Sequence, residues 1–215
     1  MQSSEGIGSQ VPILFKSEYG MTSPSRIISR DFYRSSPIIV APALIGKLLV
    51  RNIEGSLVSG IINETEAYMG DIDSASHAFK GKTPRNQVMF GEPGHAYVYF
   101  VYGLYNMLNI VVGNIGEPWV VLIREIIPVD GIGIMKKLRG REKNLTNGPG
   151  RLCKALAVDR NLNGIDLTIA DQLWVESGMD ISKSQISSQP RIGIDYALPE
   201  HKAAHWRFTL KKGVL

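Results

Sequence analysis

The chain has little of what several classes of protein require. Its 215 residues include a single cysteine, Cys153, which excludes an intrachain disulfide and a multi-cysteine zinc site. No uninterrupted apolar run approaches the ~18 residues of a membrane-spanning helix. The N-terminus also lacks the charged-then-apolar layout of a secretory signal peptide. We therefore expect an intracellular protein without a membrane partner, cytoplasmic at the nucleoid in a bacterium or nuclear in a eukaryote.

Motifs that would bind common cofactors are also absent. The sequence has no dinucleotide fingerprint, no Walker A phosphate loop and no Gly-x-Ser-x-Gly elbow of a serine hydrolase. His201 and His205 have the spacing of metal ligands, but a zinc protease would have a glutamate between them and a third ligand elsewhere. We predict neither a metal nor an organic cofactor.

Positive charge exceeds negative charge by a small margin. Lys and Arg total 24 against 20 Asp and Glu, for a net charge of +4. The placement of these cations is more informative, because they gather in three clusters that favour a polyanionic partner, although a solvated face is the plainer reading. The clusters are Lys80, Lys82 and Arg85; Lys136, Lys137, Arg139, Arg141 and Lys143; and Arg151 with Lys154.

The length fits one domain with a sizeable core. We divide the chain into a loose N-terminal arm over residues 1–26, rich in Ser, Gly and Gln, and one folded domain over residues 27–215. Strands are expected at 47–53, 57–68, 96–102, 105–112, 119–125 and 173–176, helices at 38–45, 132–138 and from 151, and a polar connector at 182–189. Because strands and helices mix without regular alternation, we predict an α+β fold with a mostly antiparallel sheet.

Two glutamates on one strand are the first candidates for chemistry. Period-two alternation places Glu64, Glu66 and Tyr68 on one face, together with Ile62. Two carboxylates buried side by side would repel, and the pKa of one would rise. A solvent-facing strand edge is the alternative, and a β-bulge that turns one of them outward is another. The apolar neighbours on the same face favour a functional carboxylate.

Tyrosines form the second candidate group. Tyr68 and Tyr99 are placed to hold a planar base between their rings, where stacking is worth ~1–3 kcal/mol per base. Tyr102 precedes Gly103 at the tip of a predicted protruding hairpin, and an apolar tip of this kind suits insertion into a nucleic-acid groove. An ordinary aromatic core is the alternative for the tyrosines, and a hydrogen-bonding surface residue is the alternative for His77.

A turn before a short helix is the third candidate. Gly148-Pro149-Gly150 leads into Arg151 and offers free backbone amides to a phosphate. A simple turn and cap would use the same residues.

At these positions the sequence resembles the 3-methyladenine (alkyladenine) DNA glycosylase family, from about Ile28 to Phe208. The motifs that carry the resemblance are Glu64-Thr65-Glu66-Ala67-Tyr68, His77, Thr83-Pro84-Arg85-Asn86 with Met89-Phe90, Tyr97-Val98-Tyr99 through Tyr102-Gly103 to Asn109, Leu122-Ile123-Arg124, Gly148-Pro149 with Leu152-Cys153, and Pro190-Arg191-Ile192-Gly193-Ile194.

The resemblance implies a role for each of these positions. Glu66 becomes the base that activates water, and Arg124, also assigned to the catalytic group, helps to position the water and the backbone. The base pocket consists of Tyr68, His77, Tyr99 and Asn109, the inserted residue is Tyr102, and contacts to the DNA backbone come from Arg85, Gly148, Gly150 and Arg151. The implied fold is a single α+β domain around a curved antiparallel sheet flanked by helices, without metal or cofactor.

We therefore predict a monofunctional DNA glycosylase of base excision repair, acting as a monomer on double-stranded DNA. It would flip alkylated or deaminated purines out of the duplex and cut the N-glycosidic bond, leaving an abasic site. Two alternatives stay open. One is a module that binds damaged nucleic acid without cutting it, and the other is a nucleoside hydrolase that acts on small molecules.

Overall fold

The computed structural model describes residues 26–101 and 103–215. Two predictions fall outside these residues. One is the loose N-terminal arm, of which only Arg26 is described, and the other is the placement of Tyr102.

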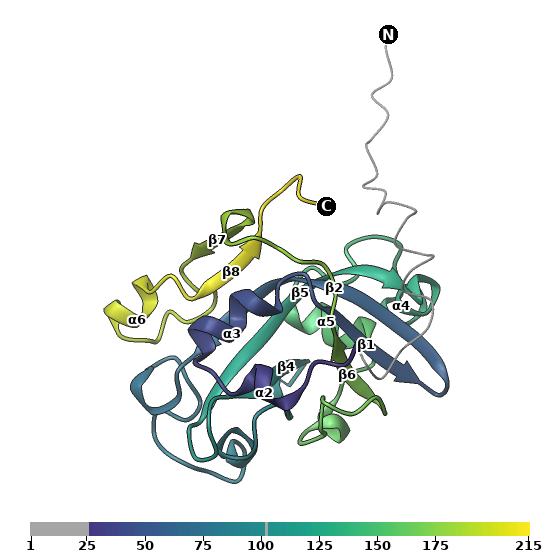
Figure 1. The fold of residues 1–215 in the computed structure, drawn as a ribbon. Coiled ribbons are helices and arrows are strands. Elements are labelled where there is room, and N and C mark those ends of the chain that lie inside the picture. Colours follow the sequence, from purple (N-terminus) through teal and green to yellow (C-terminus); the bar gives the residue numbers. More distant parts are fainter. Residues whose placement is uncertain (1–25, 102) are drawn as a thin grey trace.

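An antiparallel sheet organises the domain, and the predicted α+β class is confirmed (Figure 1). The main path of the 8-stranded sheet runs β3-β4-β5-β2-β1-β6, and β7 pairs with β8, which pairs in turn with β2. The strands are β1 (Leu48–Ile53), β2 (Ser56–Tyr68), β3 (Ala96–Val101), β4 (Tyr105–Val112), β5 (Trp119–Asp130), β6 (Leu173–Glu176), β7 (Ile186–Gln189) and β8 (Arg207–Leu210).

Strand β2 lies at the centre of this sheet and has a partner strand on both sides over much of its length. Strand β5 pairs with one edge of β2 from Ser59 to Tyr68, while β1 and then β8 pair with successive parts of the other edge. Glu64 and Glu66 therefore lie on a strand with a neighbour on both sides, between β5 and β8. The alternative of an exposed strand edge for these glutamates is wrong.

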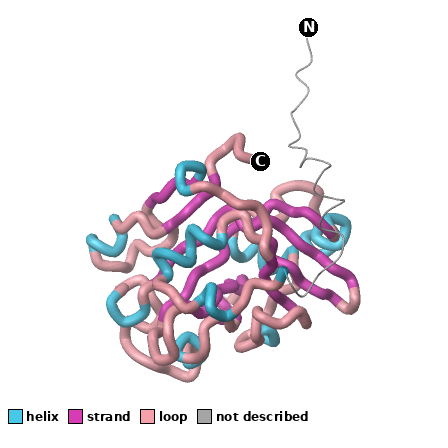
Figure 2. Tube along the Cα trace, viewed as in Figure 1, coloured by secondary structure: helices cyan, strands magenta, loops and turns pink. Residues whose placement is uncertain are grey.

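The helices are short, and long loops connect them around the strands (Figure 2). The α-helices are α2 (Arg30–Tyr33), α3 (Pro37–Leu44), α4 (Ile132–Arg139), α5 (Pro149–Ala155) and α6 (Pro199–Ala203). The 3-10 turns are η2 (Gly70–Ile72), η3 (Gln87–Phe90), η4 (Arg160–Leu162) and η5 (Lys183–Gln185). Helix α3 begins as predicted, because the Ser36 side chain accepts a hydrogen bond from the Ile38 N–H and Pro37 occupies the first turn.

The two faces of the sheet have different coverings. Helices α3, α4 and α5 pack on one face and complete the main apolar core, which includes Val121 and Ile123 of β5. The residues between them on β5, Leu122 and Arg124, face the opposite side and line a pocket. Strand alternation therefore separates a closed core on one face from the pocket on the other.

A β-bulge in β2 overturns part of the predicted alternation. Ile62 packs in the main core, as does Ala67, although residues five positions apart in a regular strand face opposite sides. The pairing of β2 with β5 shifts register between Ile62 and Glu64 and again between Glu64 and Thr65. Such a shift changes the phase of the side chains. Ile62 is therefore not on the face of Glu64, Glu66 and Tyr68.

Two other features differ from the predictions or stay untested. Residues 182–189, predicted as a polar connector, contain η5 and β7, because β7 pairs with β8 at the sheet's edge and does not need an apolar face. Strands β3 and β4 pair antiparallel up to Val101 and Tyr105, and the protruding hairpin tip stays a prediction. Within residues 26–101 and 103–215, no helix combines the length and apolar character needed to cross a membrane.

Candidate active site

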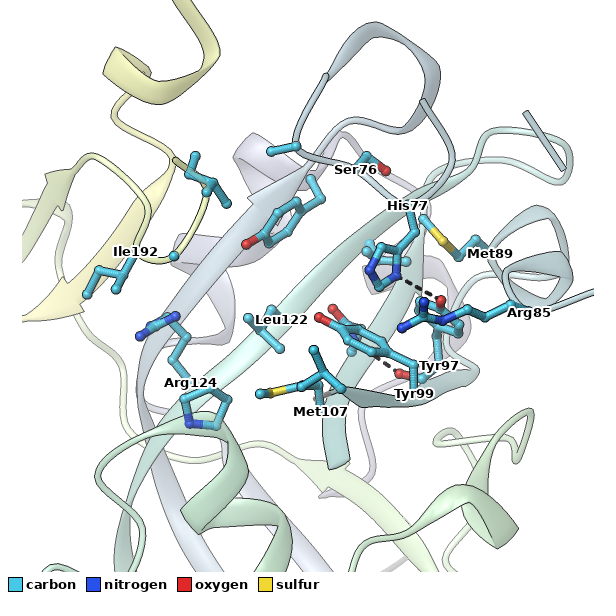
Figure 3. Close-up of a pocket in the computed structure, with 18 of the residues that line it drawn as sticks. Ser76, His77, Arg85, Met89, Tyr97, Tyr99, Met107, Leu122, Arg124 and Ile192 are labelled. Carbon is cyan, nitrogen blue, oxygen red and sulfur yellow. Dashed lines mark hydrogen bonds between the residues drawn. The ribbon is translucent and has the colours of Figure 1, made fainter. Parts of the chain in front are cut away.

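A cavity of about 410 Å³ opens on the face of the sheet opposite the main apolar core (Figure 3). Its walls come from β2, β3, β4 and β5, from Pro149 at the start of α5, from the segment around residues 75–89, and from the loop at 192–196. The cavity brings together six of the predicted site residues, which are Tyr68, His77, Arg85, Tyr99, Asn109 and Arg124.

One wall of the cavity is aromatic. The rings of His77 and Tyr99 meet edge to face with centroids 4.4 Å apart, and Tyr97 lies 5.4 Å from Tyr99. His77 Nδ1 lies 3.0 Å from the Tyr97 hydroxyl, within hydrogen-bonding distance. The backbone places these groups, because Tyr97 and Tyr99 share one face of β3. The wall can hold a flat ring system by stacking.

The titratable groups of this wall are held in their neutral forms. Burial, with a smaller effect of the nearby Arg85 charge, lowers the pKa of His77 to about 4. Burial raises the pKa of Tyr97 to about 12 and raises the pKa of Tyr99 as well. A neutral imidazole can donate from one nitrogen and accept at the other. At neutral pH His77, Tyr97 and Tyr99 therefore recognise a ligand by shape and hydrogen bonds, without a charge of their own, and Arg85 is the charged group beside them.

Asn109 lines the cavity and is almost fully buried. Its Nδ2 donates a hydrogen bond to the Tyr97 carbonyl oxygen at 3.1 Å. Asn109 lies opposite Tyr97 in the β3–β4 ladder, so this contact ties the side chain to the neighbouring strand. A fixed amide at this position can distinguish ligands by the groups that they present to it.

Glu66 lies directly behind the opposite wall. Its side chain is fully buried and is not itself part of the cavity surface, but three groups that line the cavity hold its carboxylate. The Ile192 N–H donates to Oε1 at 2.9 Å, the Tyr68 hydroxyl donates to Oε2 at 2.8 Å, and Arg124 Nη1 lies 3.2 Å from Oε1. A carboxylate has about four acceptor positions, so these contacts leave room for another donor.

Burial raises the pKa of Glu66 above its ordinary value, and this is the largest influence on the group. The Arg124 charge, the Ile192 N–H, the Tyr68 hydroxyl and the Arg191 charge each lower the same pKa, so they partly offset the effect of burial. A carboxylate whose pKa is moved toward neutral is better matched to accepting a proton than an exposed one.

Glu64 anchors the arginine that contacts Glu66. Arg124 Nε donates to Glu64 Oε1 at 3.2 Å, and Arg207 Nη1 of β8 donates to the same oxygen at 2.9 Å. Arg124 therefore spans the two glutamates, with one nitrogen on each. The two carboxylates, which would otherwise repel each other, share the guanidinium group of Arg124.

The predicted contacts to the DNA backbone are only partly gathered at the cavity. Arg85 lines it, and its guanidinium carbon lies 5.4 Å from the Tyr99 ring centre. Gly148, with φ +136°, adopts a backbone conformation that favours glycine, just before α5. Gly150 leaves space for the Tyr105 ring, which lies 2.8 Å from where a Cβ would be. Arg151 is exposed and donates to the Asn147 side chain.

Three further residues of the site, Asp73, Arg191 and Arg207, had no predicted role. Asp73 and Arg191 form a fully buried ion pair beside Glu66, and Arg207 joins Glu64. Asp73 stands in a polar segment that looks like an ordinary loop, and Arg191 lay in a motif with no assigned role. Their partners are distant in sequence, so no local pattern could pair them.

Comparison with known proteins places the chain. A family model described as Methylpurine-DNA glycosylase (MPG) matches residues 31–213. A protein of Methanocella arvoryzae named "Putative 3-methyladenine DNA glycosylase" is 47% identical over 185 residues, covering 85% of this chain and 91% of its own length. Proteins of the same name from Carboxydothermus hydrogenoformans and Clostridium perfringens are 46% and 43% identical, each covering 86% of this chain and 95% of its own length. The chain therefore belongs to the methylpurine-DNA glycosylase family.

Proposed function

We propose that this protein, acting as a monomer, removes damaged purines from double-stranded DNA by hydrolysing the bond between base and sugar with a water that Glu66 activates. The observation that carries the proposal is a fully buried carboxylate held directly behind one wall of a cavity whose opposite wall is aromatic. The reaction class agrees with the family of the chain.

The cavity supports a flat heterocycle as its ligand. Tyr99, Tyr97 and His77 present rings on one side, and Tyr68 lies on the other. Stacking on such rings contributes ~1–3 kcal/mol per base. An alkylated purine carries a positive charge, so the ring faces attract it by a further ~1–2 kcal/mol when water is excluded. A neutral His77 does not repel that cation.

The proposed chemistry uses Glu66 as a general base. Glu66 accepts a proton from a water as the water oxygen bonds to C1′ of the sugar, and the electrons of the glycosidic bond leave with the base. The negative carboxylate also stabilises the positive charge that develops on the sugar. A cationic purine is already a good leaving group and needs no acid. Arg124 holds the Glu66 carboxylate in place during this step.

The surface near the cavity supports a polyanionic partner. Arg139, Arg141 and Arg151 lie close together. Burial is the largest cause that lowers the pKa of Arg139, and the charges of Arg141 and Arg151 lower it further. Among residues 26–101 and 103–215, none of these three forms an ion pair with a carboxylate. Arginines that repel one another without an acidic partner are suited to phosphates. We assign backbone contacts to Arg85, Gly148, Gly150 and Arg151, and insertion into the duplex to Tyr102.

The test compares two buried glutamates of the same sheet. Glu66→Gln should slow release of methylated purine from duplex DNA by about 10²–10⁴-fold, because the amide cannot accept the proton. Glu176 is also buried, on β6, but it accepts its hydrogen bond from the Trp174 indole N–H and not from a residue of the cavity. Glu176→Gln is therefore the matched control and should release base at the wild-type rate. Binding to uncleaved lesion DNA should survive in Glu66→Gln.

The same assay distinguishes the alternatives. Methylated duplex DNA and free methylated nucleosides are incubated with the wild-type protein, and released base is quantified by chromatography. Release from duplex DNA that depends on Glu66 supports the proposal. Binding without release would favour a damage-recognition module, and release from nucleosides alone would favour a nucleoside hydrolase.

A further inference from the structure

Asp73 and Arg191 form an ion pair whose two side chains are fully buried. Arg191 Nη1 donates to Asp73 Oδ2 at 2.5 Å and Nη2 donates to Oδ1 at 2.8 Å, so the contact is bidentate. The same guanidinium donates to the Ala67 carbonyl oxygen at 2.9 Å and to the His201 carbonyl oxygen at 3.3 Å. One side chain thus joins β2, the segment after it and the end of α6.

Two aromatic rings fix the plane of this guanidinium. Its central carbon lies 4.5 Å from the Tyr68 ring centre and 4.9 Å from the Trp206 ring centre. Tyr68 is also the residue whose hydroxyl donates to Glu66 Oε2. The buried arginine therefore contacts the ring that positions one oxygen of the candidate base.

The backbone next to Arg191 positions the other oxygen. Ile192 follows directly, and its N–H donates to Glu66 Oε1 at 2.9 Å. Ile192, Gly193 and Ile194 also line the cavity. Arg191 anchors the start of this loop, since its side chain is tied to Asp73 and to β2. Replacing a buried ion pair by apolar residues is often neutral for stability, so such a pair calls for a reason other than stability.

We propose that Asp73 and Arg191 are a positioning pair for Glu66. The pair holds the Ile192 N–H and the Tyr68 hydroxyl against the two oxygens of Glu66, and the Arg191 charge stabilises the ionised carboxylate. The inference rests on the proposed function, because it assigns these residues a part in the step that Glu66 performs. Neither residue touches the cavity surface, so both act through Glu66, Tyr68 and Ile192.

The two members of the pair carry opposite charges, so their removal should shift the pKa of Glu66 in opposite directions. The groups that face Glu66 are Arg124 from β5, Tyr68 from β2 and Arg191 from the loop after β7, with Glu64 and Arg207 bridged to Arg124. The Arg191 charge lowers the pKa of Glu66. Removing that charge leaves the Asp73 anion and should raise this pKa. Removing the Asp73 charge leaves Arg191 unneutralised and should lower it.

The experiment measures single-turnover base release from methylated duplex DNA as a function of pH. Arg191→Met should reduce the maximal rate by about 100-fold, as expected for a displaced catalytic group, and move the acid limb of the profile to higher pH. Asp73→Asn should move the same limb to lower pH. Arg191→Lys keeps the charge without the bidentate fork, so its limb should stay near that of wild type while its maximal rate falls.

The control separates a positioning role from a loss of stability. Arg30 pairs with Asp166 away from the cavity, so Arg30→Met breaks an ion pair without touching Glu66 and should keep the wild-type limb. Circular dichroism at the assay temperature identifies variants that fold. If Arg191→Met does not fold, Asp73→Asn and Arg191→Lys decide the question.

Shifts of opposite sign in Arg191→Met and Asp73→Asn, or the Asp73→Asn shift with an unmoved limb in Arg191→Lys, support the inference. Folded variants that keep the wild-type limb and rate overturn it, as do shifts in the same direction. If the wild-type protein itself releases no base, the proposed function fails instead, so the two failures are distinguishable.

Discussion

The two walls of the cavity are built from different chemistry. On one side, Tyr97, Tyr99 and His77 contact one another through rings and one neutral hydrogen bond. On the other side, Arg124 and Ile192 line the cavity (Figure 3). Behind them lies a network in which carboxylates alternate with guanidinium groups. The network consists of Glu64, Glu66 and Asp73 with Arg124, Arg191 and Arg207. The first wall suits recognition of a flat ligand, and the second suits proton transfer.

Burial favours the neutral form of the titratable groups on both walls, but partner charges offset it strongly on only one of them. On the aromatic side it drives His77 and the tyrosines toward their neutral forms, and few opposite charges oppose it. On the charged side burial raises the pKa of Glu66, but Arg124 and Arg191 oppose that effect. The comparison indicates that a buried group stays ionisable here only where partner charges were buried with it.

The largest effect on the difference between the two walls is expected from removing the charge that bridges the two glutamates. Arg124→Gln should slow base release by about 100- to 1000-fold, because Glu66 loses its largest stabilising charge and Glu64 keeps only Arg207. The acid limb of the pH–rate profile should also move to higher pH, since Arg124 lowers the pKa of Glu66. Single-turnover rates from pH 5 to 9 measure both effects.

The matched comparison for Arg124 is Arg207→Gln. Arg207 contacts Glu64 but not Glu66 and does not line the cavity, so its loss should have a smaller effect on rate and limb. Equal losses in the two variants would mean that the network acts as a structural unit, without the separate role assigned to Arg124.

The aromatic wall should respond to a change of ring without a response to pH. Tyr99→Ala should lower kcat/KM for release of a methylated purine from duplex DNA by about 30-fold, which corresponds to ~2 kcal/mol of lost stacking. Tyr99→Phe keeps the ring and should stay near wild type. Both variants should keep the acid limb, because neither removes a charge. A loss in Tyr99→Phe as large as in Tyr99→Ala would contradict a stacking role.

Much of the fold was predictable because local signals agreed with one another. The Ser36-Pro37 cap set the start of α3, and the β-branched and aromatic content of β2, β3 and β4 gave their positions to within a residue. The start of β5 was also predicted, but its last five residues, 126–130, were not. Strand β7 was missed because its four residues, Ile-Ser-Ser-Gln, show no alternation of apolar and polar residues from which a strand could be predicted. The bulge in β2 was missed because a change of register depends on the partner strand, β5.

The site was predictable to the extent that its residues cluster in motifs. Tyr68, His77, Tyr99, Asn109 and Arg124 converge on one cavity, as expected for a single binding site. Asp73 and Arg191 were not assigned, because a buried ion pair joins segments 118 positions apart and neither residue signals its partner. Strand alternation alone could not predict the burial of Glu66, since that burial depends on β8 and on the 190–194 loop.

The smallest expected effect concerns stability, and it sharpens the contrast at the aromatic wall. The pKa of His77 falls from 6.5 to about 4 on folding, so the unfolded chain binds the proton more tightly. The contribution of His77 to stability is therefore fully present above pH 6.5 and is lost as pH falls toward 4. Relative to His77→Gln, the wild-type protein should lose about 1–2 kcal/mol of unfolding free energy between pH 7 and pH 4.5.

Urea denaturation at the two pH values measures this difference. His205 is exposed, so His205→Gln serves as the control and should follow the wild-type dependence. The contribution of Glu66 to the free energy of unfolding has the opposite pH dependence. Burial raises the pKa of Glu66, so its ionisation costs stability as pH rises above 4.5. Glu66→Gln should therefore become more stable than wild type as pH rises toward 7. Wild-type and His77→Gln curves that run parallel would mean that His77 is not held neutral, and the two walls would then differ less in charge than their contacts indicate.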